Sequence, residues 1–329
     1  MLINPEPMSK EHSIIKSIVS KFNARKFIGD DCVFLETENL LCSTDSLIEG
    51  VHFLKDTPPY SLGWKTAAVN ISDIAAMGGN PKYFLLSASL PSSKNSSWIN
   101  EFMDGLKKCL DKYSVQLVGG DLTNAEKVCL CGTILGSPFQ GQVAKRSYAK
   151  QGDKIFLAGN LGESAAGLWA LQNTNFNQFQ KLKQSHLQPM PKIEEGKNLL
   201  LESIKQQTSS LIPNNSLKIP SMMDTSDSLL DCLLQIGGQS KVKMVVNLDA
   251  IAVSNELKDC AQEANFNWKE WVVSGGEDYA LIATTSVSKD NLNQNNWQCI
   301  GSVEEGEGVE IVSEGEMLNL NKFQHFQHF

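Results

Sequence analysis

The feature that most constrains the fold of this 329-residue chain is the alternation of strand-like and helix-like segments in both halves of the sequence. Residues 62–76 carry apolar side chains at helical spacing, and Gly78-Gly79-Asn80-Pro81 ends that helix. Residues 83–90 and 154–158 have the apolar character of short strands. This mixture indicates a mixed α/β or α+β architecture.

Two further segments carry specific expectations. Residues 115–118 are predicted to form a buried strand that ends at Gly119-Gly120-Asp121. Residues 172–191 are polar and rich in Gln and Asn, so we expect a surface excursion there.

A turn-rich segment near residues 145–153 suggests a domain boundary. Lys145-Arg146 precedes Ala149-Lys150-Gln151-Gly152-Asp153, and a strand-like run follows. The length also suits two domains, at about 150 residues per domain. We therefore expect an N-terminal domain over residues 1–148 and a C-terminal domain over residues 149–329.

The charge balance narrows the possible partners and location. The chain has 29 basic and 37 acidic side chains, a formal charge of −8, which argues against a general nucleic-acid or anionic-membrane surface. No apolar run approaches the ~20 residues that span a bilayer, and the N-terminus lacks the pattern of a signal peptide. The eight cysteines form no CxxC pair, so we expect reduced thiols in a cytoplasmic protein with no nucleic-acid or membrane partner.

Carboxylates recur at the ends of predicted elements, next to Gly, Ser or Thr. One such Asp is usually a cap or turn residue, but six clusters in one chain suggest convergence on a site. Converging carboxylates repel one another unless cations are present, and oxygen ligands favour Mg²⁺, Mn²⁺ or Ca²⁺. The clusters are Gly29-Asp30-Asp31, Ser43-Thr44-Asp45-Ser46, Asn70-Ile71-Ser72-Asp73, Gly119-Gly120-Asp121, Met223-Asp224-Thr225-Ser226-Asp227 and Gly275-Gly276-Glu277-Asp278.

The common phosphate-binding and nucleophile motifs are missing. The sequence contains no GxxxxGK[ST], no GxGxxG and no GxSxG. This disfavours a P-loop ATPase, a common protein kinase, a Rossmann dehydrogenase and an α/β-hydrolase. Dispersed carboxylates suit a magnesium–nucleotide site, because Mg²⁺ takes one or two carboxylates and leaves other positions to water and phosphate.

An ordered series of motifs resembles the thiamine-monophosphate kinase family, within the superfamily of aminoimidazole ribonucleotide synthetase and selenophosphate synthetase. The resemblance covers residues 10 to 326. Its motifs are IGDDCVFL (28–35), STDSLIEGVHF (43–53), LGWKTAAVNISDIAAMGGNP (62–81), VGGDLTNA (118–125), KRSYAKQGDKIFLAGNLGESAAGL (145–168), MMDTSDSLLDCL (222–233) and SGGEDYALI (274–282).

The resemblance implies ATP-dependent phosphorylation of thiamine monophosphate to thiamine diphosphate. It implies an aminoimidazole ribonucleotide synthetase-like fold, with an N-terminal sheet domain that forms a homodimer and a C-terminal α/β domain. ATP and several Mg²⁺ ions would lie between the domains.

The resemblance also implies roles for individual residues. The metal ligands would be Asp30, Ser43, Thr44, Asp45, Asp73, Asp121, Asp224 and Asp227. The ATP contacts would be Gly120, Asp121, Arg146 and Ser226. The thiamine monophosphate contacts would be His52, Glu277 and Phe323. The attacking phosphate oxygen is already anionic at neutral pH, so no residue is expected to act as a covalent nucleophile or general base.

Two other functions remain open from the sequence. One is another ATP-using synthetase of the same superfamily, in which ATP activates a substrate oxygen. The other is a non-catalytic protein that keeps the fold and binds nucleotide or metal, although the intact aspartates argue against it.

Overall fold

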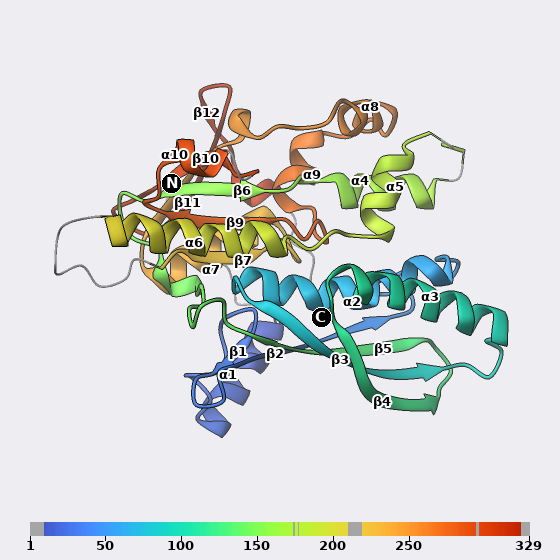
Figure 1. The fold of residues 1–329 in the computed structure, drawn as a ribbon. Helices are drawn as coiled ribbons and strands as arrows, with labels where there is room; N and C mark the ends of the chain where they lie inside the picture. The colour runs from blue at the N-terminus through green and yellow to red at the C-terminus, as the bar shows by residue number, and fades with distance from the viewer. Residues whose placement is uncertain (1–9, 174, 177, 210–218, 294–295, 324–329) are drawn as a thin grey trace.

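The computed structural model describes residues 10–173, 175–176, 178–209, 219–293 and 296–323. Within these residues the chain forms two sheets, one from each half of the sequence, with helices packed between and around them (Figure 1). The prediction of a mixed α/β architecture is confirmed.

The first sheet has five strands in the order β1-β2-β5-β3-β4. The strands are β1 (Val33–Leu35), β2 (Leu40–Ile48), β3 (Asn80–Leu90), β4 (Gln116–Asn124) and β5 (Cys129–Ser137). Strand β3 runs parallel to β4 and antiparallel to β5. Helix α1 (Lys10–Phe22) precedes this sheet, and α2 (Pro59–Ala76) and α3 (Ser96–Lys112) pack against each other on one of its faces.

Strand β4 differs from the buried strand that the sequence predicted. It starts at Gln116 and runs through Gly119-Gly120-Asp121 to Asn124, and all nine residues are exposed. The apolar run at 115–118 suggested burial, but β4 is the edge strand of the sheet and pairs only through β3. Asp121 therefore lies within a strand rather than in a turn.

The second sheet has seven strands in the order β12-β11-β8-β10-β6-β9-β7. Its strands are β6 (Lys154–Ala158), β7 (Ser221–Asp224), β8 (Lys243–Asn247), β9 (Leu281–Thr285), β10 (Gln298–Glu304), β11 (Gly308–Ser313) and β12 (Glu316–Met317). The helices of this half are α4 (Glu163–Gln172), α5 (Gln180–Leu187), α6 (Ile193–Ser209), α7 (Leu229–Ser240), α8 (Asn255–Glu263), α9 (Trp268–Ser274) and α10 (Lys289–Asn293). Short 3-10 turns lie at η1 (Arg146–Tyr148), η2 (Leu248–Ala250) and η3 (Leu320–Lys322).

The polar segment 172–191 is more ordered than a surface excursion. It contains helix α5, whose Leu182 and His186 are buried against neighbouring elements. Leu182 packs with residues of α4 and α8 in a small hydrophobic cluster. The high Gln and Asn content hid these two inward positions.

Helix α2 connects the two halves physically. It contacts β2 and β5 of the first sheet and also α6 and β7 of the second half, and it runs between the two sheets in Figure 1. Almost all of its residues are buried. Gly63 lets α3 approach closely, because a Cβ at that position would lie 1.9 Å from the carbonyl oxygen of Phe102. Polar residues on α2 are therefore held rigidly where the two halves meet.

The hydrophobic core is also shared between the halves. One buried cluster contains Phe84 and Ile134 of the first sheet together with Phe156 and Leu281 of the second. The first sheet ends at Ser137 and the second begins at Lys154, and the boundary between residues 148 and 149 stays a prediction. All eight cysteines are free thiols. Across the described ranges, no helix combines the length and apolar character needed to cross a membrane.

Candidate active site

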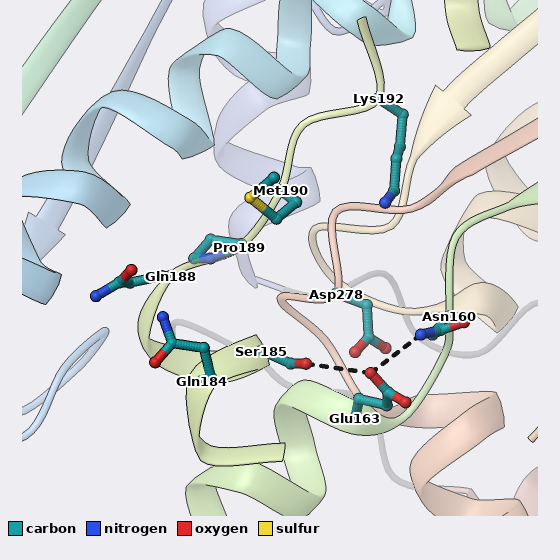
Figure 2. Close-up of a pocket in the computed structure, with 9 residues that line it drawn as sticks. All are labelled: Asn160, Glu163, Gln184, Ser185, Gln188, Pro189, Met190, Lys192 and Asp278. Atoms are coloured by element: carbon teal, nitrogen blue, oxygen red, sulfur yellow. Dashed lines mark hydrogen bonds between the residues drawn. The ribbon is translucent and has the colours of Figure 1, made fainter. Parts of the chain in front are cut away.

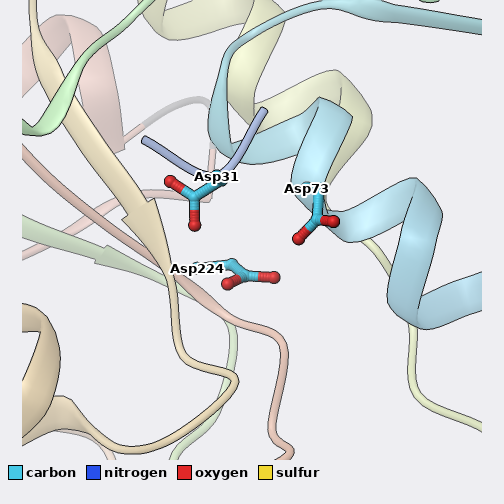
Figure 3. A group of neighbouring side chains, drawn as sticks. All are labelled: Asp31, Asp73 and Asp224. Atoms are coloured by element: carbon cyan, nitrogen blue, oxygen red, sulfur yellow. The ribbon is translucent and has the colours of Figure 1, made fainter. Parts of the chain in front are cut away.

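Three aspartates from distant parts of the sequence converge at the junction of the two halves. Asp31 precedes β1, Asp73 lies in the last turn of α2, and Asp224 ends β7. One carboxylate oxygen from each lies within 4.8 Å of the others, and the side chains point toward one another (Figure 3). We call these three residues the carboxylate cluster.

Burial makes the negative charge of this cluster costly. Asp224 is 1% exposed, and burial together with the charge of Asp31 raises its pKa to about 8. Burial, followed by the charges of Asp45 and Asp224, raises the pKa of Asp73 well above its ordinary value. Each carboxylate disfavours ionisation of its neighbours.

Hydrogen bonds satisfy only part of the cluster. Ser72 Oγ donates to Asp224 Oδ2 at 2.5 Å. Asp224 Oδ1 is buried and has no hydrogen-bond partner in the part of the chain that the structure describes. A buried carboxylate oxygen without a partner is expensive, and a divalent cation with oxygen coordination would satisfy it. The donor set therefore fits Mg²⁺.

Arg146 supplies a fixed positive charge at the edge of the cluster. Its Nη2 lies 2.8 Å from Asp31 Oδ1 and its Nε donates to Asp31 Oδ2 at 3.3 Å, while Nη1 donates to Gln235. Its backbone N–H donates to Asp30 Oδ1 at 2.9 Å. Arg146 thus holds both aspartates of the Asp30-Asp31 pair, and Asp31 rather than Asp30 belongs to the carboxylate cluster.

Strand β2 places its predicted ligands on opposite faces of the first sheet. Ser43 hydrogen-bonds to Asp73, and the backbone N–H of Asp45 donates to Asn70 Oδ1 on α2 at 3.2 Å. Thr44 is exposed and donates to the carbonyl of Gly132 at 2.7 Å. Side chains alternate along a strand, so Ser43 and Asp45 face α2 while the Thr44 side chain faces outward.

The other predicted nucleotide and metal residues lie in two places. Gly120 and Asp121 are on the exposed strand β4. Gly120 has a φ of +157°, and a Cβ there would lie 1.8 Å from the carbonyl oxygen of Leu86, so only glycine fits. Ser226 and Asp227 form the turn that follows Asp224. Their roles as ligands stay predictions.

The Gly275–Tyr279 segment is fastened to that same turn. The backbone N–H of Glu277 donates to the carbonyl of Ser226 at 2.7 Å. A Cβ on Gly276 would lie 2.6 Å from the carbonyl oxygen of Asp227, so the two backbones touch. Glu277 has a φ of +62°, a left-handed conformation that a glutamate adopts at some cost. The tertiary contacts hold the segment in this strained shape.

Glu277 also belongs to a buried polar network. Its Oε2 lies 3.1 Å from Lys65 Nζ on α2 and 3.5 Å from His186 Nδ1 on α5. Burial works to raise the pKa of Glu277, but the positive charge of Lys65 lowers it below its ordinary value. Burial and Lys65 lower the pKa of His186 to about 3, so this imidazole is neutral near pH 7. We call Lys65, Glu277 and His186 the ion-pair network.

His52 and Phe323, the other two residues predicted to contact substrate, come from different halves of the chain. His52 follows β2, and its Nδ1 accepts a hydrogen bond from the backbone N–H of Ile48 at 3.0 Å. Phe323 packs against the core of the second half. Its contact with a thiamine ring stays a prediction.

A cavity of about 190 Å³ lies beside the Gly275–Tyr279 segment (Figure 2). Asp278 lines it and accepts hydrogen bonds from the backbone N–H groups of Gly162 and Ser164 at the start of α4. Glu163, also in the lining, accepts hydrogen bonds from Asn160 and Ser185. These contacts give Asp278 a role in capping a helix, whereas the adjacent Glu277 turns toward Lys65.

Comparison with known proteins identifies the family. Residues 29–137 match the AIR synthase related protein, N-terminal domain. Thiamine-monophosphate kinase of Buchnera aphidicola subsp. Acyrthosiphon pisum is 35% identical to this chain, over 93% of each protein. The enzyme of Aquifex aeolicus is 33% identical over 94% of this chain and 96% of its own length. The chain belongs to the thiamine-monophosphate kinase family.

A solved structure supports the same relationship. AaThiL complexed with AMPPCP and TMP superposes with a TM-score of 0.82 at 32% identity, covering 99% of this chain and 100% of that one. The resemblance to the thiamine-monophosphate kinase family and the two-part fold that it implies are therefore confirmed.

Three residues of the site escaped the sequence analysis: Asp31, Lys65 and His186. Asp31 stood beside Asp30 in a recognised motif, but adjacent aspartates give no sign of which one turns inward. Lys65 lies inside the LGWKTAAVNISD string, where a lysine on an otherwise apolar helix segment could have been noticed. Its partner Glu277 is 212 positions away, so only the fold reveals the pair.

Proposed function

We propose that this chain transfers the γ-phosphoryl group of ATP to thiamine monophosphate, forming thiamine diphosphate, with Mg²⁺ ions held by its carboxylates. The observation that carries the proposal is the carboxylate cluster at the junction of the two halves, in a chain of the thiamine-monophosphate kinase family. The structure of AaThiL complexed with AMPPCP and TMP supports the choice of these two substrates.

The residues that would hold Mg²⁺ are those with unsatisfied or repelling oxygens. Asp31, Asp73 and Asp224 form the centre, and Asp45 adds its charge to Asp73 and Asp224. We extend the proposal to Asp30, Ser43, Asp121 and Asp227, which the resemblance also indicated. The remaining residue that it indicated is Thr44, whose hydroxyl faces away from this centre and donates to Gly132. When bound, Mg²⁺ supplies positive charge that neutralises and orients the β- and γ-phosphates.

The chain's own residues provide position and charge rather than a covalent step. The acceptor oxygen of thiamine monophosphate is anionic near pH 7, so no base is needed to activate it. Arg146, fixed between Asp31 and Gln235, would contact ATP with a planar cation. Gly120 and Ser226 would contact ATP, while His52, Glu277 and Phe323 would contact thiamine monophosphate.

A product assay tests this proposal directly. The protein is incubated with ATP, Mg²⁺ and thiamine monophosphate, and the products are separated by chromatography and followed by ³¹P NMR. We expect ADP and thiamine diphosphate in equal amounts. Release of ADP with a product that is not phosphorylated would favour another synthetase of the superfamily, and binding of ATP without turnover would favour a non-catalytic protein.

We also propose that the chain forms a homodimer through the open edge of the first sheet. The edge strand β4 is exposed along its whole length, and its Val118 and Leu122 are 49% and 72% exposed. Tyr83 on the adjacent strand β3 is exposed as well. An open edge with exposed apolar side chains is usually covered in the native assembly. Light scattering at micromolar concentration should give a dimer mass, and Leu122→Glu should weaken it. A monomeric wild-type protein would contradict the proposal.

A further inference from the structure

Lys65 is a buried cation whose role the phosphoryl-transfer chemistry does not explain. It lies on α2, is 1% exposed, and sits in a helix whose neighbouring residues are nearly all buried. A lysine is rarely buried to this extent unless its ammonium is paired, because removal from water is costly. Its contacts therefore indicate why it is there.

The ammonium of Lys65 contacts two residues that are proposed to bind thiamine monophosphate, Glu277 and His52. Its Nζ donates to Glu277 Oε2 at 3.1 Å and to the backbone carbonyl of His52 at 3.5 Å. His52 belongs to the first half of the chain and Glu277 to the second. One buried group thus links the two parts of the substrate-binding side.

Glu277 needs such a partner. Its backbone is in a left-handed conformation and its side chain is partly buried, 26% exposed, so local geometry alone does not fix the carboxylate. The neighbouring His186 is neutral and hydrogen-bonded to Ser164 Oγ at 3.0 Å, so it does not balance the charge. Lys65 is the cation that keeps Glu277 ionised and in place.

We propose that Lys65 is a positioning residue for thiamine monophosphate: it holds Glu277 and the His52 segment at a fixed separation without touching the substrate itself. The inference rests on the proposed function, since it concerns the thiamine monophosphate side of that site. It assigns no role to Lys65 in binding ATP or metal.

The test is steady-state kinetics of Lys65→Met, which keeps the length of the side chain and removes its charge. We expect the KM for thiamine monophosphate to rise about tenfold, the scale of coupling between residues in one network. The KM for ATP and the Mg²⁺ dependence should change less than about twofold. Thr66→Val is the matched control, because it deletes one buried hydrogen bond of the same helix, from Thr66 Oγ1 to the carbonyl of Leu62.

A double variant separates positioning from simple damage to the fold. In Lys65→Met/Glu277→Gln both charges are absent, so neither is left buried alone, and this variant should fold even if Lys65→Met does not. If Lys65 acts in large part through Glu277, the rise in KM for the double variant should be smaller than the combined rises of the two single variants. Additive effects, or equal rises in the KM values of both substrates, would overturn the proposal.

Direct binding distinguishes failure of this inference from failure of the proposed function. Calorimetric titration of thiamine monophosphate into the wild-type protein and Lys65→Met needs no turnover. Weaker binding by the variant supports the role of Lys65 even if the wild type transfers no phosphate, and equal binding by both proteins overturns it. A wild type that neither binds nor phosphorylates thiamine monophosphate overturns both proposals.

Discussion

The carboxylate cluster and the ion-pair network both join the two halves of the chain, but their charges are arranged in opposite ways. Asp31, Asp73 and Asp224 concentrate negative charge, and burial and mutual repulsion raise the pKa values of Asp73 and Asp224. In the network, Glu277 is partly buried, yet Lys65 lowers its pKa. The negative charge of Glu277 is balanced by Lys65 within the network, whereas the negative charge of the carboxylate cluster requires added cations.

This difference indicates how each region meets its ligands. A balanced pair can hold its shape in the free protein and offer a preorganised surface to an organic substrate. An unbalanced cluster is unfavourable until a metal arrives, so it favours tight metal binding at a cost in stability of the free protein. The following predictions, from the largest effect to the smallest, test this contrast.

Asp224→Asn should have the largest effect. The change keeps the side-chain shape but removes a charge from the cluster, so turnover should fall at least about a hundredfold even at high Mg²⁺. The metal-free protein should melt at an equal or higher temperature, because one repelling carboxylate is gone. A coupled ADP assay and thermal melting measure both quantities. Near-normal turnover at low millimolar Mg²⁺ would contradict the assignment of the cluster. We expect Asp45→Asn to lose turnover in the same way as Asp224→Asn.

Glu277→Ala and His52→Ala should affect the substrate rather than the metal. We expect each change to weaken binding of thiamine monophosphate about tenfold and to leave binding of a non-hydrolysable ATP analogue nearly unchanged. Calorimetry with each ligand measures the two affinities separately. Loss of nucleotide binding with intact thiamine monophosphate binding would reverse the assignment of roles.

The stability of the metal-free protein should fall as the pH rises. The pKa of Asp224 is about 8 in the folded protein against an ordinary value of 3.8, so the folded state holds a proton that the unfolded chain releases. This contribution is complete below about pH 4 and is lost as the pH rises through about 8. In EDTA the melting temperature should therefore drop between pH 6 and pH 8.5.

Mg²⁺ and the Asp224→Asn variant provide the controls for that pH dependence. Added Mg²⁺ should raise the melting temperature more at pH 8.5 than at pH 6, because the cation replaces the proton. Asp224→Asn should flatten the profile in EDTA. A melting temperature that is constant or rising over this range in the wild type would show that the cluster is not protonated in the free protein.

A solvent-exposed ion pair should give the smallest effect on stability and serves as a reference for the Lys65–Glu277 pair. Lys107 and Asp111 form an i,i+4 pair on α3, with side chains 73% and 59% exposed. Lys107→Ala should change the free energy of unfolding by about 0.5 kcal/mol or less and leave both KM values unchanged. Denaturant unfolding provides the measurement. An effect as large as that of Lys65→Met would remove the contrast between buried and exposed pairs.

The family motifs named Asp73, Asp224 and Glu277 among the residues that the fold brings together, and the alternation of elements predicted the mixed architecture. Strand β4 shows where local pattern failed, because an apolar run predicts a strand but not whether another strand or a partner covers it. Helix α5 shows the reverse error, since two inward positions among many polar residues give a weak periodic signal.

The sequence by itself determined the chemistry that is available, namely oxygen ligands in Gly-, Ser- and Thr-flanked segments, and it determined the family. Only the tertiary structure decided which oxygens meet. Asp31, and not Asp30, lies beside Asp73 and Asp224, because the carboxylate of Asp30 accepts a hydrogen bond from the backbone N–H of Arg146 instead. The pairing of Lys65 with Glu277 is likewise set by the packing of α2 against the second half, because contacts between distant residues depend on the path of the whole chain and not on the pattern of any one segment.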